Sequence, residues 1–160
     1  MGPGQAGGEG FRVVAAAPRE GGRLAAAVRR FHGESGREVG PAQAGAIHAL
    51  CSDPSLERAW LLADGRNRDV GYALAYWRHS IDRGGRVAVL DDLWIEPDLR
   101  GRGLGRRLME TVLADMSASG ARAAVVEADP ADAPAMAFYA RLGFAAAGTT
   151  LLARTLPGGR

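Results

Sequence analysis

The stretch "LRGRGLGRRL", residues 99–108, decides how the rest of the chain is read, because it combines three glycines with four arginines. Glycines this close together disfavour a regular strand and weaken the start of a helix. Arginines this close together repel one another unless an anion lies near them. The stretch therefore predicts either an anion-binding turn or a plain loop whose residues reflect only a biased composition.

Two segments with clear periodicity flank this stretch. Residues 85–95 are typical of a strand, and residues 104–119 predict an amphipathic helix with Leu104, Leu108 and Val112 at helical spacing. The first N–H groups of a helix lack intrahelical partners, and nearby glycines let a phosphate approach them closely. Arginine adds charge and paired hydrogen bonds. We therefore expect a phosphorylated ligand, such as a diphosphate.

The composition excludes several classes of site. All 20 basic residues are arginine, so the chain lacks the lysine of a P-loop, a pyridoxal phosphate enzyme or a Schiff-base aldolase. The dinucleotide pattern G-x-G-x-x-G fails, because Arg106 stands where its last glycine is required. Cys51 is the single cysteine and the histidines are scattered, so no disulfide framework and no metal site are expected.

Charge and hydropathy bear on partners and location. The net charge is only +2 and aromatic residues do not alternate with the arginines, so no nucleic-acid partner is expected. No run of about 18 apolar residues predicts a membrane span. The glycine-rich start has no apolar signal region, so we expect a cytoplasmic protein.

Periodicity and turn residues predict one domain over residues 11–156, with flexible tails at 1–10 and 157–160. The expected order alternates strands and helices in a way that gives a mixed sheet flanked by helices. The expected strands are 11–17, 57–64, 70–80, 85–95, 121–129 and 149–155, and the expected helices are 19–31, 41–54, 104–119 and 130–144.

Three motifs in this order resemble the GNAT family of N-acetyltransferases. Arg100-x-x-Gly103-x-Gly105 is similar to the acyl-CoA signature of that family, "DDLWIEPDLRG" to the end of its fourth strand, and "APAMAFYARLGF" to its last hallmark. The resemblance covers roughly residues 11–155. It implies an α/β (α+β mixed sheet) fold with a mostly antiparallel sheet, strands four and five splayed around a bulge, and acyltransferase activity.

The resemblance also implies which residues hold acetyl-CoA, the expected co-substrate. Backbone amides of the glycine-rich stretch would cradle the pyrophosphate, and the end of the fourth strand would pair with the pantetheine arm. Ile95 is the candidate whose N–H polarises the thioester carbonyl. Asp132 stands where many relatives carry Asn, so it can accept hydrogen bonds and cap a helix but cannot donate. The full expected set is Leu93, Trp94, Ile95, Arg100, Gly101, Arg102, Gly103, Leu104, Gly105, Arg106, Asp132, Ala135 and Phe138.

Catalysis by direct transfer needs a base for the attacking ammonium and an acid for the leaving thiolate. Tyr139 matches the hallmark tyrosine of the family and is the expected acid; a core aromatic is the alternative. Strict alternation places Asp91 on one strand face with Val87, Val89, Leu93 and Ile95, and Asp92 on the other with Leu90 and Trp94, unless a bulge shifts the parity. "LDDLW" resembles the polyamine and thialysine branch, which makes Asp91 the first candidate for the base and Asp92 the second.

The acceptor is expected to be a small primary amine such as a polyamine, an amino acid or a xenobiotic amine. A peptide or protein N-terminus, or an acyl-CoA sensor without turnover, are the alternatives. Glu34 and Glu38 either attract the cationic amine or belong to a solvated loop. A homodimer through residues 149–155 is also expected from the resemblance. Candidates for the lining of the acceptor pocket are Phe31, His32, Glu34, Tyr76, Trp77 and His79.

Overall fold

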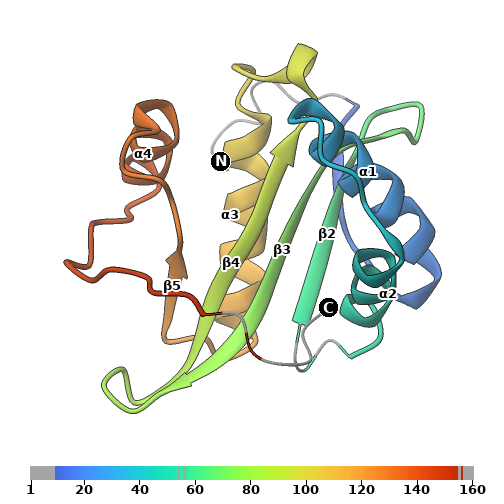
Figure 1. Cartoon of the computed structure of the whole chain (residues 1–160). Helices are drawn as coiled ribbons and strands as arrows, with labels where there is room; N and C mark the ends of the chain where they lie inside the picture. Colours follow the sequence, from blue (N-terminus) through green and yellow to red (C-terminus); the bar gives the residue numbers. More distant parts are fainter. Residues whose placement is uncertain (1–9, 54, 56, 155, 157–160) are drawn as a thin grey trace, which may run out of the picture. The chain divides into compact units, whose positions relative to one another are not determined.

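The computed structural model describes residues 10–53, 55, 57–154 and 156 (Figure 1). The chain divides into two compact units, one ending at Glu127 and the other beginning at Ala128. The expected tails at 1–10 and 157–160 therefore lie outside the described residues, except for Gly10. The first unit holds the sheet and three of the helices of the described chain, and the second holds one helix.

The first unit is built on a five-stranded sheet in the order β1-β2-β3-β4-β5. The first three pairings are antiparallel, and β4 pairs with β5 in parallel after the crossover through α3. The sheet is thus mixed and mostly antiparallel, as the sequence predicts. The strands are β1 Arg12–Ala15, β2 Glu57–Ala63, β3 Asp69–Ser80, β4 Gly85–Ile95 and β5 Ala123–Val126.

Two helices, α1 (Gly21–Glu34) and α2 (Pro41–Leu50), cover one face of the sheet, as Figure 1 shows. Pro41 begins α2, as predicted, because a first-turn N–H needs no partner. The core on this face is closed by buried apolar side chains, and Cys51 is one of them. The members of this core are Leu24, Ala25, Ala27, Val28, Ile47, Cys51, Ala59, Leu61, Tyr72, Leu74 and Trp94.

Helix α3 (Leu104–Ala118) covers the opposite face of the sheet. Trp60 of β2 faces α3, whereas the next residue, Leu61, faces the core under α1 and α2. The predicted apolar stripe of α3 is buried, including Leu108 and Met116. The indole Nε1 of Trp60 donates to Asp115 of α3 over 2.9 Å, which satisfies the polar atom of a side chain that is 1% exposed. Sheet and helix are therefore joined by a specific hydrogen bond as well as by apolar burial.

Strict alternation along β4 is interrupted by a bulge, the alternative that the sequence left open. Leu74 of β3 pairs with Asp92 and Ala75 pairs with Leu90, so Asp91 has no opposite residue. Paired residues share a face, and Leu74 belongs to the α1/α2 core. Asp92 and Trp94 therefore face α1 and α2, and so do Val87 and Val89, whereas Leu90, Leu93 and Ile95 face α3.

The second unit contains α4 (Ala133–Arg141), which is shorter than the predicted 130–144. The Asp132 side chain accepts from the N–H of Ala135 over 3.0 Å, which confirms the predicted cap. The strand expected at 149–155 is wrong over 149–154, and Thr155 lies outside the described residues. Its apolar residues Leu151 and Leu152 are 66% and 88% exposed, so they lack the burial that holds a strand.

The other boundaries move by a few residues. Helix α1 begins at Gly21, after a short 3-10 turn at 18–20, and runs three residues beyond the predicted end. Strand β5 covers 123–126 where 121–129 is predicted. In the described part of the chain, every helix is too short or too polar to cross a membrane.

Candidate active site

Among the residues that the structure describes, the end of β4 has no strand partner on the side of β5. The pairing of β4 with β5 stops at Leu90, whereas β4 continues to Ile95. The N–H of Glu96 donates to Val70 on the β3 side over 2.8 Å, so alternation turns the backbone groups of Ile95 and Leu93 to the opposite edge. An edge without a strand partner can accept an extended arm as an additional strand. The backbone of Trp94 faces β3 instead.

A glycine turn follows this edge and starts α3. Gly103 is the N-cap of α3 with a φ of +78°, a conformation that favours glycine. The N–H of Arg107 makes the first intrahelical bond, to Gly103, so the N–H groups of 104–106 have no partner within the helix. Space is open on the Cβ side of Gly101 and Gly103. The turn thus fits an anion such as a pyrophosphate at a helix N-terminus.

The arginine side chains of the glycine turn differ in their contacts. Arg102 is exposed, and Arg106 pairs with Glu110 one helical turn later over 2.7 Å. The Arg100 side chain turns back instead: its Nε donates to the Ile95 carbonyl over 2.8 Å, and its Nη2 binds both carboxylate oxygens of Glu34. Its side chain is therefore committed within the protein, which the motif alone does not reveal.

The half-buried carboxyl of Asp92 is the chemically distinctive group on the α1/α2 face. The hydroxyl of Tyr72, which is 0% exposed, donates to its Oδ2 over 3.1 Å. Burial raises the pKa of Asp92 above its ordinary value, and the hydrogen bond from Tyr72 only partly opposes this. Burial and the adjacent carboxylate also raise the pKa of Tyr72, which keeps it a neutral donor. A carboxylate with a raised pKa is suited to accept a proton.

Asp91 differs from its neighbour, because the bulge leaves it exposed. The end of α1 is connected to Asp92 by Tyr72, which binds Asp92 and also contacts Phe31, with 6.2 Å between the two ring centroids. The guanidinium of Arg37 lies 5.8 Å from the Phe31 centroid. His32 contacts the Phe31 ring edge-on. The structure thus brings these predicted lining residues together.

Three other predicted lining residues lie further along β3. Tyr76, Trp77 and His79 pair with Val89, Ala88 and Arg86, toward the hairpin turn and away from Asp92. The Trp77 ring is covered by the Arg86 guanidinium at 3.7 Å, and its indole N–H has no partner among the described residues. Because a strand rises about 3.3 Å per residue, His79 lies roughly 16 Å along β3 from Leu74, the partner of Asp92.

Sequence reasoning missed Tyr72. It stands two residues before Leu74 in a strand that the sequence predicts correctly. Its partner Asp92 is 20 positions away, however, and only the register of β3 on β4 brings the two together. The alternation of Tyr72 and Leu74 with smaller residues was the available signal, and it indicates burial rather than a hydrogen bond.

In the second unit, the ring of Tyr139 packs edge-on against Phe138 and Phe144, with centroid distances of 5.2 and 5.7 Å. Gly143 has a φ of +88° just after α4, which ends the helix as the sequence predicts. The predicted acid therefore sits within a small aromatic cluster of its own unit, beside Phe138.

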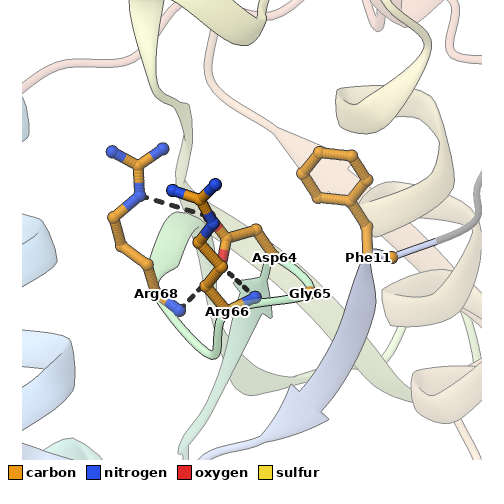
Figure 2. A pocket seen from close by; sticks show the side chains of 6 residues that line it. Phe11, Asp64, Gly65, Arg66 and Arg68 are labelled. Atoms are coloured by element: carbon orange, nitrogen blue, oxygen red, sulfur yellow. Dashed lines mark hydrogen bonds and ion pairs between the residues drawn. The ribbon is translucent and has the colours of Figure 1, made fainter.

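A shallow pocket at the β2–β3 turn lies apart from these groups. Figure 2 shows that it is lined by Phe11, Asp64, Gly65, Arg66 and Arg68, together with Gly10. Asp64 accepts from the backbone N–H groups of Arg66 and Arg68 and from the Arg68 side chain. These bonds lower its pKa and close the turn, so the carboxylate has a structural role. Within the described ranges, no group of three or more potential metal ligands occurs.

Comparison with known proteins agrees with this geometry. The acetyltransferase (GNAT) family model matches residues 23–144. A serotonin N-acetyltransferase 2 of Oryza sativa subsp. japonica is 36% identical over 89 residues, 56% of this chain; the chain spans only 42% of that protein.

Solved structures show the same fold. An integron cassette protein from the mobile metagenome of Cole Harbour Salt Marsh is 32% identical, with a TM-score of 0.80 and 90% of each chain covered. An aminoglycoside acetyltransferase from an uncultured soil sample, in complex with sisomicin, also has a TM-score of 0.80, at 16% identity over 91% of this chain and 96% of its own. With the family model covering most of its residues, the chain belongs to the GNAT family of acyl-CoA-dependent N-acetyltransferases.

Proposed function

We propose that this protein transfers an acetyl group from acetyl-CoA to a primary amine of a small molecule, directly and within a ternary complex. The observation that carries the proposal is the half-buried Asp92 of β4, which accepts a hydrogen bond from Tyr72 of β3. The end of β4 has no β5 partner beyond Leu90 and leads to the glycine turn that starts α3. A proton acceptor and an anion-binding turn thus lie on one continuous segment. Acetyl-CoA supplies the activated thioester.

The cofactor side of the proposal uses backbone groups. The amides of residues 102–106 would hold the pyrophosphate, and Leu93 and Ile95 would pair with the pantetheine arm along the free edge of β4. The Ile95 N–H, beside the carbonyl that Arg100 already binds, would donate to the thioester oxygen as negative charge develops. The contacts with acetyl-CoA expected for Asp132, Ala135 and Phe138 stay predictions from the sequence.

Asp92 is proposed as the base in place of Asp91, the first candidate from the sequence. Its burial favours the protonated form, so it takes a proton from the acceptor ammonium more readily than an exposed carboxylate does. Asp91 is exposed in the bulge and is proposed to add negative charge that attracts the cationic amine.

The acceptor class is supported by relatives that act on small amines. The rice relative is a serotonin N-acetyltransferase, and the soil relative is an aminoglycoside acetyltransferase. A polyamine, the acceptor suggested by "LDDLW", or an amino acid, fits the same carboxylates. A peptide N-terminus, or an acyl-CoA sensor without turnover, is the competing function.

A titration of acetyl-CoA by calorimetry, followed by thiol release with a panel of amines, tests the function. We expect binding of acetyl-CoA and thiol release with one class of small primary amine. Release with peptides alone would favour the competing acceptor, and binding without release from any amine would favour the sensor. No binding of acetyl-CoA would refute the proposal.

Tyr139→Phe tests the proposed acid. Removal of the hydroxyl is expected to lower kcat about 100-fold with little change in either KM, because proton transfer to the leaving thiolate occurs only in the chemical step. The ring contacts with Phe138 and Phe144 remain in this variant, and thermal unfolding shows whether it is folded. Steady-state kinetics check this, with Tyr76→Phe on β3 as the matched control; an unchanged kcat would remove Tyr139 from the mechanism.

We also propose a cytoplasmic homodimer. β5 ends the described sheet with one paired edge, and Leu151, Leu152 and Leu156 expose apolar surface within the second unit. Light scattering of the purified chain would establish the oligomeric state.

A further inference from the structure

The side chain of Glu34, at the last residue of α1, is tied to the end of β4 by two neighbours. Its carboxylate oxygens accept from Nη2 of Arg100 over 2.7 and 3.0 Å, and Oε1 also accepts from Nε1 of Trp94 over 2.5 Å. The Glu34 side chain is 32% exposed, so these bonds are partly shielded from water. Burial raises the pKa of Glu34, but both hydrogen bonds and the Arg100 charge lower it more, so the carboxyl is held ionised.

Arg100 passes this contact on to the backbone of β4. Its Nε donates to the carbonyl of Ile95 over 2.8 Å while its Nη2 is held by Glu34. The planar guanidinium fixes both contacts relative to each other, which a lysine would not do. The carbonyl of Ile95 points to the free edge of β4, the same direction as its N–H. A contact that fixes the Arg100 side chain therefore also fixes the orientation of the Ile95 N–H.

The rest of α1 supports this contact. Arg23 makes two hydrogen bonds to Asp69 at the start of β3, and Arg30 pairs with Glu96 over 2.8 Å. Arg30 also lies over the Trp94 ring, 5.1 Å from its centroid. Three charged groups on one helix thus bind the start of β3 and the end of β4. The position of Glu34 is fixed by helix contacts along its length, so it is a rigid anchor for Arg100.

We propose that Glu34 is a positioning residue for the acyl-CoA thioester: through Arg100 it holds the Ile95 peptide and the entrance of the glycine turn, and it does not contact the acceptor. This inference rests on the proposed function, because it assigns the Ile95 edge to the thioester. It differs from both alternatives expected for Glu34, attraction of the cationic amine and a place in a solvated loop. It also makes Arg100 an internal link whose side chain does not bind the pyrophosphate directly.

Glu34→Gln, which keeps the size of the side chain and removes its charge, is the first variant. We expect the KM and the Kd for acetyl-CoA to rise about tenfold and the KM for the amine to stay within about twofold, because a charged hydrogen bond is weakened on the cofactor side alone. Asp82→Asn, exposed in the β3–β4 turn, is the charge-matched control and should change neither constant.

A double variant separates positioning from general destabilisation. If Glu34 acts through Arg100, then Glu34→Gln adds no further loss of acetyl-CoA affinity in an Arg100→Met background. Arg100→Lys should also lose affinity, since a lysine cannot bind Glu34 and the Ile95 carbonyl together. Thermal unfolding of every variant shows whether it is folded under the assay conditions.

Two results would overturn the inference while leaving the proposed function intact. A rise in the amine KM alone would place Glu34 in the acceptor pocket, and additive losses in the double variant would separate it from Arg100. Failure of the unaltered chain to bind acetyl-CoA would instead refute the proposed function itself.

Discussion

Asp92→Asn is expected to lower kcat/KM for the amine about 1,000-fold at neutral pH, because it removes the proposed proton acceptor while keeping the shape of the side chain. The Tyr72 hydroxyl can still donate to the amide oxygen of an asparagine, so the local fold is preserved. The raised pKa of Asp92 makes the acid limb of the wild-type pH–rate profile report its ionisation. In the variant this limb should disappear. Rate measurements from acid to neutral pH check both expectations.

The stability of Asp92→Asn should stay the same or rise, although its activity falls. A carboxyl whose pKa is raised by folding stabilises the fold fully below its unfolded value, about 3.9, and loses that contribution as the pH rises through its folded value. At neutral pH the ionised Asp92 therefore costs stability, and the asparagine variant should unfold at the same temperature as wild type or a higher one. Asp91→Asn is the comparison: a larger loss of activity there than at Asp92 would contradict the assignment.

Gly71→Ala is expected to destabilise the fold by about 2 kcal/mol and to lower Tm by roughly 6 °C. Gly71 pairs with Ile95 where β3 meets the end of β4. A Cβ at this position would lie 2.7 Å from Cδ1 of Ile95 and 2.8 Å from the carbonyl oxygen of Trp94. The second contact is with backbone and cannot be relieved by a rotamer change, so β4 must move away from β3.

The same movement should weaken acetyl-CoA binding, because it displaces the edge that carries Ile95. Thermal unfolding and calorimetry together measure the two effects. Gly45→Ala in α2 is the matched control, since a Cβ there meets nothing within 4 Å and alanine favours a helix by about 1 kcal/mol over glycine. An unchanged Tm in Gly71→Ala would contradict the prediction, because it would show that β3 and β4 can separate enough to accommodate a Cβ without loss of stability.

Much of the fold follows from local pattern. The 104–119 stripe, the Asp132 cap and the Gly143 stop are properties of neighbouring residues, and each is present in the structure. The glycine turn is also predictable from the sequence, because the positive φ at Gly103 and the start of α3 depend on only a few neighbouring residues. Strand 85–95 was predicted to the residue for the same reason.

What the sequence could not give depends on register between distant strands. The bulge at Asp91 is visible only when β4 is laid on β3, and it decides which carboxylate is half-buried. The links of Tyr72 to Asp92 and of Glu34 to Arg100 join residues 20 and 66 positions apart. The expected last strand at 149–155 failed for a related reason: threonine and leucine residues favour a strand locally, but a strand also needs a partner.

The bulge has an evolutionary consequence. If Asp91 were removed, Leu90 would be followed by Asp92 without any change in partner residues, since Ala75 and Leu74 already face these two. Every other side chain of β4 would keep its face. Without Asp91 the pairing of β3 with β4 would be regular, so one inserted codon suffices to produce the bulge that leaves Asp91 exposed beside the half-buried Asp92.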